Sequence, residues 1–358
     1  MAKFRKIGIL TSGGDAPGMN ATIRAITRKA IEEGVEVVGI IGGYKGLIEG
    51  DFVPLTPRSV SNIITRGGTM LYSNRCLEMK TPEGKEQAVK TCRENHIDAI
   101  VAIGGDGTFR GATELTRYGV PTIAIPGTID NDITATDYTV GFDTAMNTVL
   151  SLIDDLRDTC ESHSRCNVVE VMGRDCGCIA LNSGIASGAV AIAIPEVPFD
   201  ADAAIEKIKQ VKADGKRGMI VVVSEGVKTA DGQPIGEYLT KRIEAETGIE
   251  TRFARFAHIV RGGSPTLRDR LTATIMGAAA VEQLLAGESN LVICEDDGVI
   301  KPLDIKFALA VDRMYKNKLD EGDLEGFSDE QIEEMKSICA KRSAEIDRLY
   351  KLARVICK

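Results

Sequence analysis

Short apolar runs alternate with helix-like segments along most of this chain, and this alternation restricts the possible folds more than any other feature. Four of these runs are KIGIL at 6–10, DAIVAI at 98–103, PTIAIP at 121–126 and NVVEVM at 167–172. Nearly continuous hydrophobic runs are typical of strands in a parallel sheet that is covered on both faces. The sequence therefore predicts an α/β fold of three layers, with helices on both sides of mostly parallel sheets.

The chain has 358 residues, which is more than one small hydrophobic core usually organises. We expect two αβα domains, and an amphipathic helix that follows Gly141 is the candidate boundary between them. The last part of the chain, 321–358, has no strand signal and predicts a helical C-terminal extension. Within it, Ser328 and Gln331 have the spacing of an N-terminal capping box.

The composition excludes several classes of protein. A formal net charge of −8 argues against general binding of nucleic acid. The apolar runs are too short to span a bilayer, and the N-terminus lacks the architecture of a signal peptide, so we expect a cytoplasmic protein with no membrane partner. Nine cysteines without a C-x-x-C pair, and only three histidines, predict reduced, mostly buried thiols and not a zinc site.

Two glycine-rich segments follow predicted strands, TSGGDAPGMN at 11–20 and IGGDGTFRGA at 103–112. Glycine lets the backbone approach a ligand closely, and the start of the next helix attracts anions. Each segment alone could be a tight strand-to-helix turn, but two of them, each with an aspartate, favour a phosphate site. The usual P-loop motif and the protein-kinase motifs do not occur.

Three aspartates lie at these strand exits. Asp106 lies inside the second glycine-rich segment, where a bare carboxylate would repel phosphate, so we interpret it as a ligand of Mg²⁺. Asp130 and Asp132 follow the apolar run of IPGTIDNDI at 125–133. In an extended segment both side chains would point the same way, and one could serve as a base for a sugar hydroxyl. The alternative is an Asx-turn pair that caps the loop.

Arginines at predicted strand ends could supply an anion pocket, because the guanidinium group suits bidentate contact with phosphate. Any one of them could equally be a solvated surface charge. Together they predict two phosphate sites, one for a donor and one for an acceptor. His258 lies among them and could instead be a buried structural histidine. The arginines are Arg75, Arg165, Arg174, Arg252 and Arg261.

From about 6 to 318, the sequence closely resembles the ATP-dependent 6-phosphofructokinase family. The resemblance depends on GILTSGGDAPGMNATIRA, GGDGT, PGTIDNDI, TDYTVGFDTA, VVEVMGRDCG and HIVRGGSP, in this order. It implies transfer of the γ-phosphoryl group of Mg·ATP to the 1-hydroxyl of fructose 6-phosphate. It also implies a nucleotide-binding domain at 1–141 with 260–310, and a sugar-phosphate and effector domain at 142–259 with 311–320.

The same resemblance implies roles for individual residues. Asp130 would be the general base, Thr128 and the Gly13 backbone would contact the transferring phosphoryl group, and Arg174 would stabilise its charge. Asp106 would bind Mg²⁺. The nucleotide site would comprise Gly13, Tyr44, Arg75, Cys76, Gly105, Asp106, Gly107, Thr108 and Gly111. The sugar-phosphate site would comprise Thr128, Ile129, Asp130, Arg165, Met172, Gly173, Arg174, Glu225, Arg252, His258 and Arg261.

The resemblance also bears on assembly and phosphoryl donor. Arg165 and Arg252 match positions that family tetramers lend to a neighbouring active site, so it implies a homotetramer. Relatives that use pyrophosphate have Asp and Lys where this chain has Gly107 and Gly127, which favours ATP. The alternatives are a pyrophosphate-dependent enzyme of the same kind and a non-catalytic nucleotide-sensing subunit.

The effector site of the bacterial members is only partly matched. Arg24, Arg28, Arg157 and Lys216 match its basic positions. Val190 replaces a metal-binding Glu, and Asp214 replaces a Lys, so we expect altered or absent activation by ADP.

Overall fold

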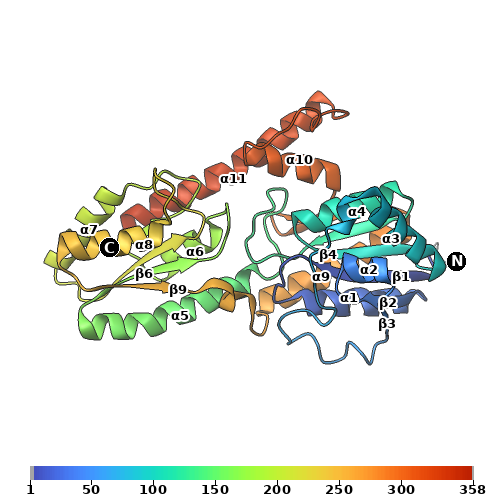
Figure 1. Cartoon of the computed structure of the whole chain (residues 1–358), viewed down its shortest axis with the longest axis horizontal. Coiled ribbons are helices and arrows are strands. Elements are labelled where there is room, and N and C mark those ends of the chain that lie inside the picture. The colour runs from blue at the N-terminus through green and yellow to red at the C-terminus, as the bar shows by residue number, and fades with distance from the viewer. Residues whose placement is uncertain (1–3, 357–358) are drawn as a thin grey trace. The chain divides into compact units, whose positions relative to one another are not determined.

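The computed structural model describes residues 4–356, and the chain divides into two compact units (Figure 1). Unit 1 comprises Met1–Ile129, Ile133–Asp143 and Arg261–Ala340. Unit 2 comprises Asp130–Asp132, Thr144–Val260 and Lys341–Lys358. Each unit has its own sheet. The expected α/β fold with mostly parallel sheets and a C-terminal helix is confirmed.

Unit 1 contains a seven-stranded sheet in the order β11-β10-β5-β4-β1-β2-β3. The inner pairs are parallel, whereas the edge strands β3 and β11 pair antiparallel with β2 and β10. Pro54 lies in β3, where a missing backbone donor is tolerated because the strand is at an edge. The strands are β1 Lys6–Ser12, β2 Glu36–Ile40, β3 Phe52–Leu55, β4 Ala99–Gly104, β5 Thr122–Pro126, β10 Leu291–Asp296 and β11 Val299–Asp304.

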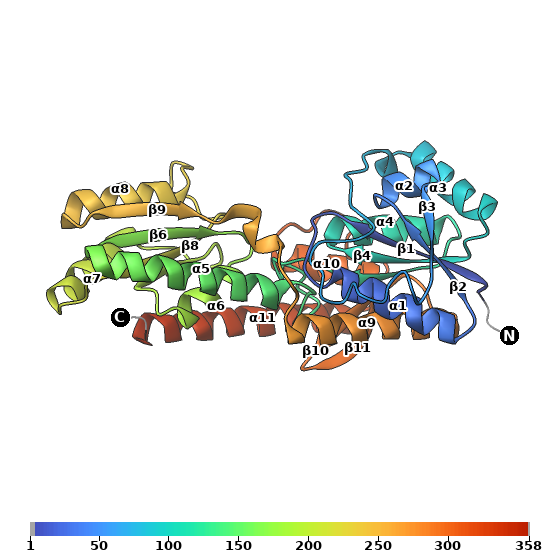
Figure 2. The ribbon, with the colours of Figure 1, turned by 90° about the horizontal axis from the view of Figure 1, so that it is seen from below.

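Helices cover both faces of this sheet, as the buried β4 and β5 require. The helices are α1 Met19–Glu32, α2 Tyr44–Glu49, α3 Pro82–Glu94, α4 Asp106–Arg117, α9 Leu267–Ala286 and α10 Ile305–Tyr315, with a short 3₁₀ helix at Glu78–Lys80. Figure 2 shows α1 and α9 packed together on one face and α3 and α4 on the other. One apolar cluster joins α3, α4 and α10 to the sheet, and Phe109 and Leu115 lie within it.

Unit 2 contains a four-stranded, fully parallel sheet in the order β7-β8-β6-β9. Its core is built from alternating residues of β6 and β8, such as Val168 and Val221, packed under α7 and α8. The strands are β6 Cys166–Val171, β7 Ala191–Ala193, β8 Met219–Ser224 and β9 Thr251–Arg255. The helices are α5 Phe142–His163, α6 Cys178–Ala186, α7 Ala201–Ala213 and α8 Ile235–Thr247, and a 3₁₀ helix, η2, covers Ala257–Arg261.

The C-terminal extension forms one long helix, α11 Asp329–Ile356. Its predicted capping box is confirmed, because the backbone N–H of Gln331 donates to Ser328 Oγ at 3.3 Å and that of Ser328 donates to Gln331 Oε1 at 3.0 Å. Met335 and Ile346 of this helix are buried, so α11 packs against the rest of the chain. The first part of α11, to Ala340, belongs by its contacts to unit 1, and the part from Lys341 belongs to unit 2.

The predicted grouping of 311–320 with the second domain differs from this division. These residues include the end of α10, whose Ala308 and Val311 are buried in the core of unit 1. The functional labels of the two domains stay predictions.

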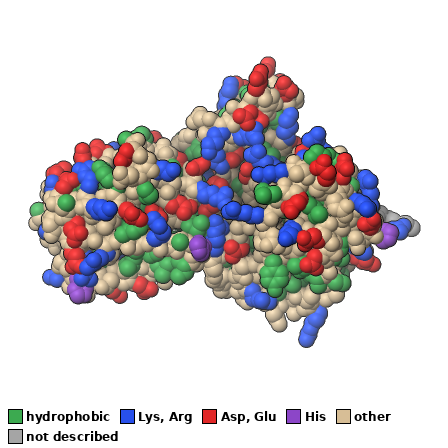
Figure 3. Space-filling view, viewed as in Figure 1, with side chains coloured by type: hydrophobic (Ala, Val, Ile, Leu, Met, Phe, Trp, Pro, Cys, Tyr) green, Lys and Arg blue, Asp and Glu red, His purple; other side chains and the backbone are tan. Residues whose placement is uncertain are grey.

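Three further features concern the described residues 4–356 as a whole. None of their helices combines the length and apolarity that a membrane crossing needs. Eight of the cysteines lie in this range, all are free thiols and six are buried, in agreement with the prediction. Acidic and basic side chains are interspersed on the face shown in Figure 3.

Candidate active site

The first glycine-rich loop joins β1 to α1 in unit 1. Gly13 has a φ of +87° and Gly18, which precedes α1, has a φ of +110°, a region that favours glycine. A side-chain carbon at Gly14 would lie 2.6 Å from Nη1 of Arg261, which donates to the carbonyl of Asp15 at 3.2 Å. The predicted phosphate ligand Arg261 therefore packs directly on this loop.

A second segment is tied to the same loop by side-chain hydrogen bonds. Asn20, in the first turn of α1, accepts from the backbone N–H of Met70 at 2.7 Å. Ser73 Oγ donates to the carbonyl of Gly13 at 2.6 Å. Arg75 follows two residues later and is exposed. Hydrogen bonds thus hold the segment that precedes Arg75 against the first glycine-rich loop, near which we expect Arg75 to act.

The second glycine-rich loop joins β4 to α4, and its glycines differ in what they touch. A side-chain carbon at Gly104 would lie 2.3 Å from the carbonyl oxygen of Ser12, so packing of β4 against β1 requires glycine there. A side-chain carbon at Gly105 or Gly107 would meet no described atom within 4 Å. Space is therefore open at the N-terminus of α4, where the helix attracts anions.

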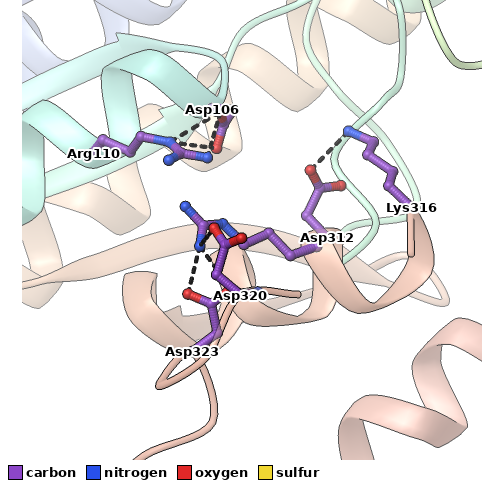
Figure 4. Close-up of polar contacts among 7 residues, drawn as sticks. Asp106, Arg110, Asp312, Lys316, Asp320 and Asp323 are labelled. Atoms are coloured by element: carbon purple, nitrogen blue, oxygen red, sulfur yellow. Dashed lines mark hydrogen bonds and ion pairs between the residues drawn. The ribbon is translucent and has the colours of Figure 1, made fainter. Parts of the chain in front are cut away.

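Asp106 is the first residue of α4, and its side chain is 43% exposed. Its Oδ2 lies 3.1 Å from Nη2 of Arg110, one turn further along the helix, and the two side chains point toward one another (Figure 4). Asp106 lies between Gly105 and Gly107 in the chain, the two positions with open space. A single exposed carboxylate beside a phosphate site suits Mg²⁺, which takes most of its other ligands from phosphate and water.

Tyr44 and Gly111 form a buried contact behind this loop. The Tyr44 ring packs on α4 so closely that a side-chain carbon at Gly111 would lie 2.5 Å from its Cζ. The Tyr44 hydroxyl donates to the carbonyl of Thr108 at 2.6 Å, and burial raises the pKa of Tyr44. Cys76 is half-buried, and burial raises the pKa of its thiol. These predicted nucleotide residues pack around the first turns of α4.

The strand exit after β5 carries Gly127 and Thr128. A side-chain carbon at Gly127 would lie 3.0 Å from Cγ2 of Ile103 and 3.3 Å from Cε of Met19, so glycine here also has a packing reason. The carbonyl of Thr128 accepts from Thr139 Oγ1 at 2.6 Å. Ile129, which follows, is fully buried.

In unit 2, the acidic loop is not extended. Asn131 has a φ of +48°, so the extended segment that was assumed for Asp130 and Asp132 is wrong, and their shared direction stays a prediction. Asp130 is 1% exposed, whereas Asp132 is partly exposed. Oδ2 of Asp130 lies 3.5 Å from Nε of Arg174, whose side chain is 64% exposed. The structure thus joins a buried carboxylate to an accessible guanidinium group.

Glu225 holds the backbone that presents Arg174. Its Oε1 accepts from the backbone N–H of Gly173 at 3.3 Å and of Arg174 at 3.1 Å. Both residues have positive φ, +147° at Gly173 and +53° at Arg174, so this carboxylate supports a turn that few residues adopt readily. Met172, which directly follows β6, is partly exposed.

Of the remaining predicted sugar-phosphate residues, Arg165 directly precedes β6, Arg252 lies in β9, and His258 and Arg261 lie in η2. Glu250 pairs with both Arg165, at 2.8 Å, and Arg252, and the hydrogen bond from Arg165 lowers the pKa of the Glu250 carboxyl. Two guanidinium groups on one carboxylate leave a net positive charge there. His258 is exposed in η2, so the alternative of a buried structural histidine is wrong.

Sequence reasoning missed one contact beside the acidic loop. Arg342, in α11, donates from Nη2 to the carbonyl of Asn131 at 2.7 Å and to Cys178 Sγ at 3.1 Å. The two residues are 211 positions apart, and no local pattern marks an arginine on an amphipathic helix as a partner of a distant loop.

Two α/β units with glycine-rich strand exits, open space at the N-terminus of α4 and accessible arginines are typical of proteins that handle phosphate groups. The chain belongs to the phosphofructokinase family, because the family model described as "Phosphofructokinase" matches residues 6–284. It is 50% identical over 316 residues to ATP-dependent 6-phosphofructokinase 1 of Clostridium perfringens, covering 88% of this chain and 97% of that protein. The ATP-dependent 6-phosphofructokinase of Clostridium botulinum matches equally well.

Solved structures agree with this assignment. Phosphofructokinase from Saccharomyces cerevisiae superposes with a TM-score of 0.84 at 28% identity, covering 98% of this chain and 50% of that chain. The Pichia pastoris phosphofructokinase in the T-state also gives 0.84, at 31% identity, covering 99% of this chain and 39% of that chain. This chain thus spans half or less of the two yeast chains. A pyrophosphate-dependent phosphofructokinase from Marinobacter aquaeolei gives 0.75 at 22% identity, which shows the shared fold.

Proposed function

We propose that this chain is a kinase that transfers the γ-phosphoryl group of ATP to the 1-hydroxyl of fructose 6-phosphate. The observation that carries this proposal is the 50% identity to an ATP-dependent 6-phosphofructokinase over 97% of that relative's length. The reaction is the committed phosphorylation of glycolysis, and we infer that it takes place in the cytoplasm.

The donor side of the reaction is assigned to unit 1. The open space at Gly105 and Gly107 and the N-terminus of α4 suit the phosphates of ATP, and the exposed Arg75 supports them. Phosphoryl transfer depends chiefly on positioning and charge neutralisation. The Asp106 carboxylate would hold Mg²⁺, which when bound neutralises charge on the donor phosphates. Tyr44, Cys76, Thr108 and Gly111 shape the nucleotide site from behind.

The acceptor side is assigned to residues of unit 2. Asp130 takes the proton of the sugar hydroxyl as general base, and Arg174, 3.5 Å away, stabilises the charge of the transferring phosphoryl group. Thr128 and the Gly13 backbone contact that group in the proposal. Glu225 fixes the turn of Arg174 through two backbone hydrogen bonds, so its contribution is to positioning as well as to sugar binding.

The 6-phosphate of the sugar is assigned to Arg165, Arg252, Arg261 and His258. Arg252 is 64% exposed, so it can reach a ligand outside its own chain. We infer that Arg165 and Arg252 act in the active site of a neighbouring subunit, and that the assembly is a homotetramer. Met172, Gly173 and Ile129 complete the sugar site in this proposal.

A coupled assay with each donor in turn tests the proposal. Purified protein is given fructose 6-phosphate with ATP, with pyrophosphate or with neither, and a panel of other ketose phosphates is tried with ATP. The proposal expects turnover with ATP and fructose 6-phosphate. Turnover with pyrophosphate alone would establish the pyrophosphate-dependent alternative, and nucleotide binding without turnover would establish a sensing subunit.

A further inference from the structure

Arg342 of α11 reaches the loop that carries the proposed general base. Its Nη2 donates to the Asn131 carbonyl at 2.7 Å and to Cys178 Sγ at 3.1 Å. All three residues belong to unit 2. Arg342 lies outside the segment 6–284 that the phosphofructokinase family model matches, so none of the roles assigned above includes it.

The contact between Arg342 and the Asn131 carbonyl affects the conformation of the loop that carries Asp130. Asn131 has a φ of +48°, in the left-handed region, which asparagine adopts more readily than most other residues, and contacts with the surrounding structure can stabilise it further. A charged donor makes a stronger hydrogen bond than a neutral one. The thiol of Cys176 also approaches the same carbonyl, at 3.6 Å, which is a weak contact by comparison. Arg342 is therefore a strong support for the Asn131–Asp132 peptide group, one residue beyond Asp130.

The charge of Arg342 also acts on two neighbouring groups, the Glu196 carboxyl and the Cys178 thiol. Glu196 accepts from the backbone N–H of Gly177 at 2.8 Å, and its burial raises the pKa of its carboxyl, while the charge of Arg342 opposes this shift. The hydrogen bond with Cys176 and the charge of Arg342 lower the pKa of the Cys178 thiol. A half-buried arginine whose Nη2 donates to both a carbonyl and a sulfur has few ways to turn.

We propose that Arg342 is a positioning residue for the phosphoryl transfer. By fixing the carbonyl of Asn131 it fixes the neighbouring backbone of Asp130, and hence the direction in which that carboxylate points when it accepts the proton. The inference rests on the proposed function, and it gives the C-terminal helix a role in the chemistry beyond covering a surface. Arg342 touches neither substrate, so its effect is transmitted through the loop.

The test compares Arg342→Met, which removes the donors at similar length, with Arg342→Lys, which keeps one charged donor. The exposed Arg348 on the same helix supplies the control, Arg348→Met. We expect Arg342→Met to lower kcat by about tenfold to a hundredfold, the range that small misplacement of a reacting group produces. The KM values for ATP and fructose 6-phosphate should stay near those of the unchanged protein, Arg342→Lys should recover part of kcat, and the control should match the unchanged protein.

A double-mutant cycle with Asp130→Asn separates positioning from general destabilisation. If Arg342 acts through Asp130, then Arg342→Met should have little further effect on kcat once the base is removed, because residues that act as a unit are not additive. An unchanged kcat in Arg342→Met, an equal loss in both backgrounds, or a loss matched by a smaller folded fraction would each overturn the inference. Absence of turnover in the unchanged protein would overturn the proposed function itself.

Discussion

Replacing Gly107 by aspartate tests how unit 1 selects its donor. Gly107 is the second residue of α4, and a side-chain carbon there would meet no described atom within 4 Å. Its φ is not positive, so the backbone accepts other residues. Aspartate also suits the first turn of a helix. The protein should therefore fold normally, and any loss of activity reports on the ligand.

The size of the effect follows from Coulomb's law. A carboxylate about 4 Å from a phosphate charge, at an effective dielectric constant of about 20, costs about 4 kcal/mol. The N-terminus of α4 stabilises the aspartate equally in the free and the ATP-bound protein, so it does not offset this repulsion. A cost of about 4 kcal/mol corresponds to a fall of about a thousandfold in kcat/KM for ATP.

The assay measures kcat/KM for ATP at saturating fructose 6-phosphate, with thermal unfolding as the check on folding. Gly107→Asn has nearly the same shape without the charge, and Gly107→Ala adds only the first carbon. We expect the asparagine and alanine variants to lose far less than the aspartate variant. An aspartate variant within about threefold of the unchanged protein, or an asparagine variant that loses as much, would refute the charge argument.

Three further outcomes follow from the structure. Val190 is fully buried and offers no carboxylate to a metal, so ADP at millimolar or lower concentration should not activate the enzyme at subsaturating fructose 6-phosphate; ordinary activation in a titration would contradict this. Ser328→Ala should cost about 1 kcal/mol of stability in urea denaturation, since it removes the cap of Gln331, and an unchanged midpoint would show that the cap is irrelevant. Tyr138→Phe should cost about 1–3 kcal/mol, because Asp269 is fully buried and accepts from the Tyr138 hydroxyl at 2.5 Å; a smaller change in unfolding free energy would show that the site reorganises.

The sequence predicts the strands well because most of them are buried on both faces. β4 and β5 are buried at every residue. Such continuous apolar runs can be identified as strands from the sequence alone, without knowing which strands pair with them. The start of the helix after Ser328 could also be predicted, because a capping box depends on residues only three positions apart. Edge strands were not identified in advance: β11 is partly exposed along its length and depends on its antiparallel partner β10.

In the candidate site, too, local features could be predicted from the sequence, whereas features that depend on distant partners could not. The glycine-rich segment at 103–112 predicts a phosphate site from its residue types, and the surroundings of its Gly105 and Gly107 are open. The direction of the Asp132 side chain could not be derived, because it depends on the positive φ of Asn131, which the surrounding structure supports. The contact of Arg342 depends on a separation of 211 residues, which only the tertiary fold creates.

The central claim is that Asp130 removes the proton from the sugar hydroxyl while ATP donates its γ-phosphoryl group. The most direct test follows product formation from ATP and fructose 6-phosphate by phosphorus NMR for the unchanged protein and for Asp130→Asn. The account predicts fructose 1,6-bisphosphate and ADP from the unchanged protein, and a kcat lower by about 10²–10⁴ in the variant, with both KM values nearly unchanged. Near-normal turnover by Asp130→Asn, or a different phosphorylated product, would contradict it.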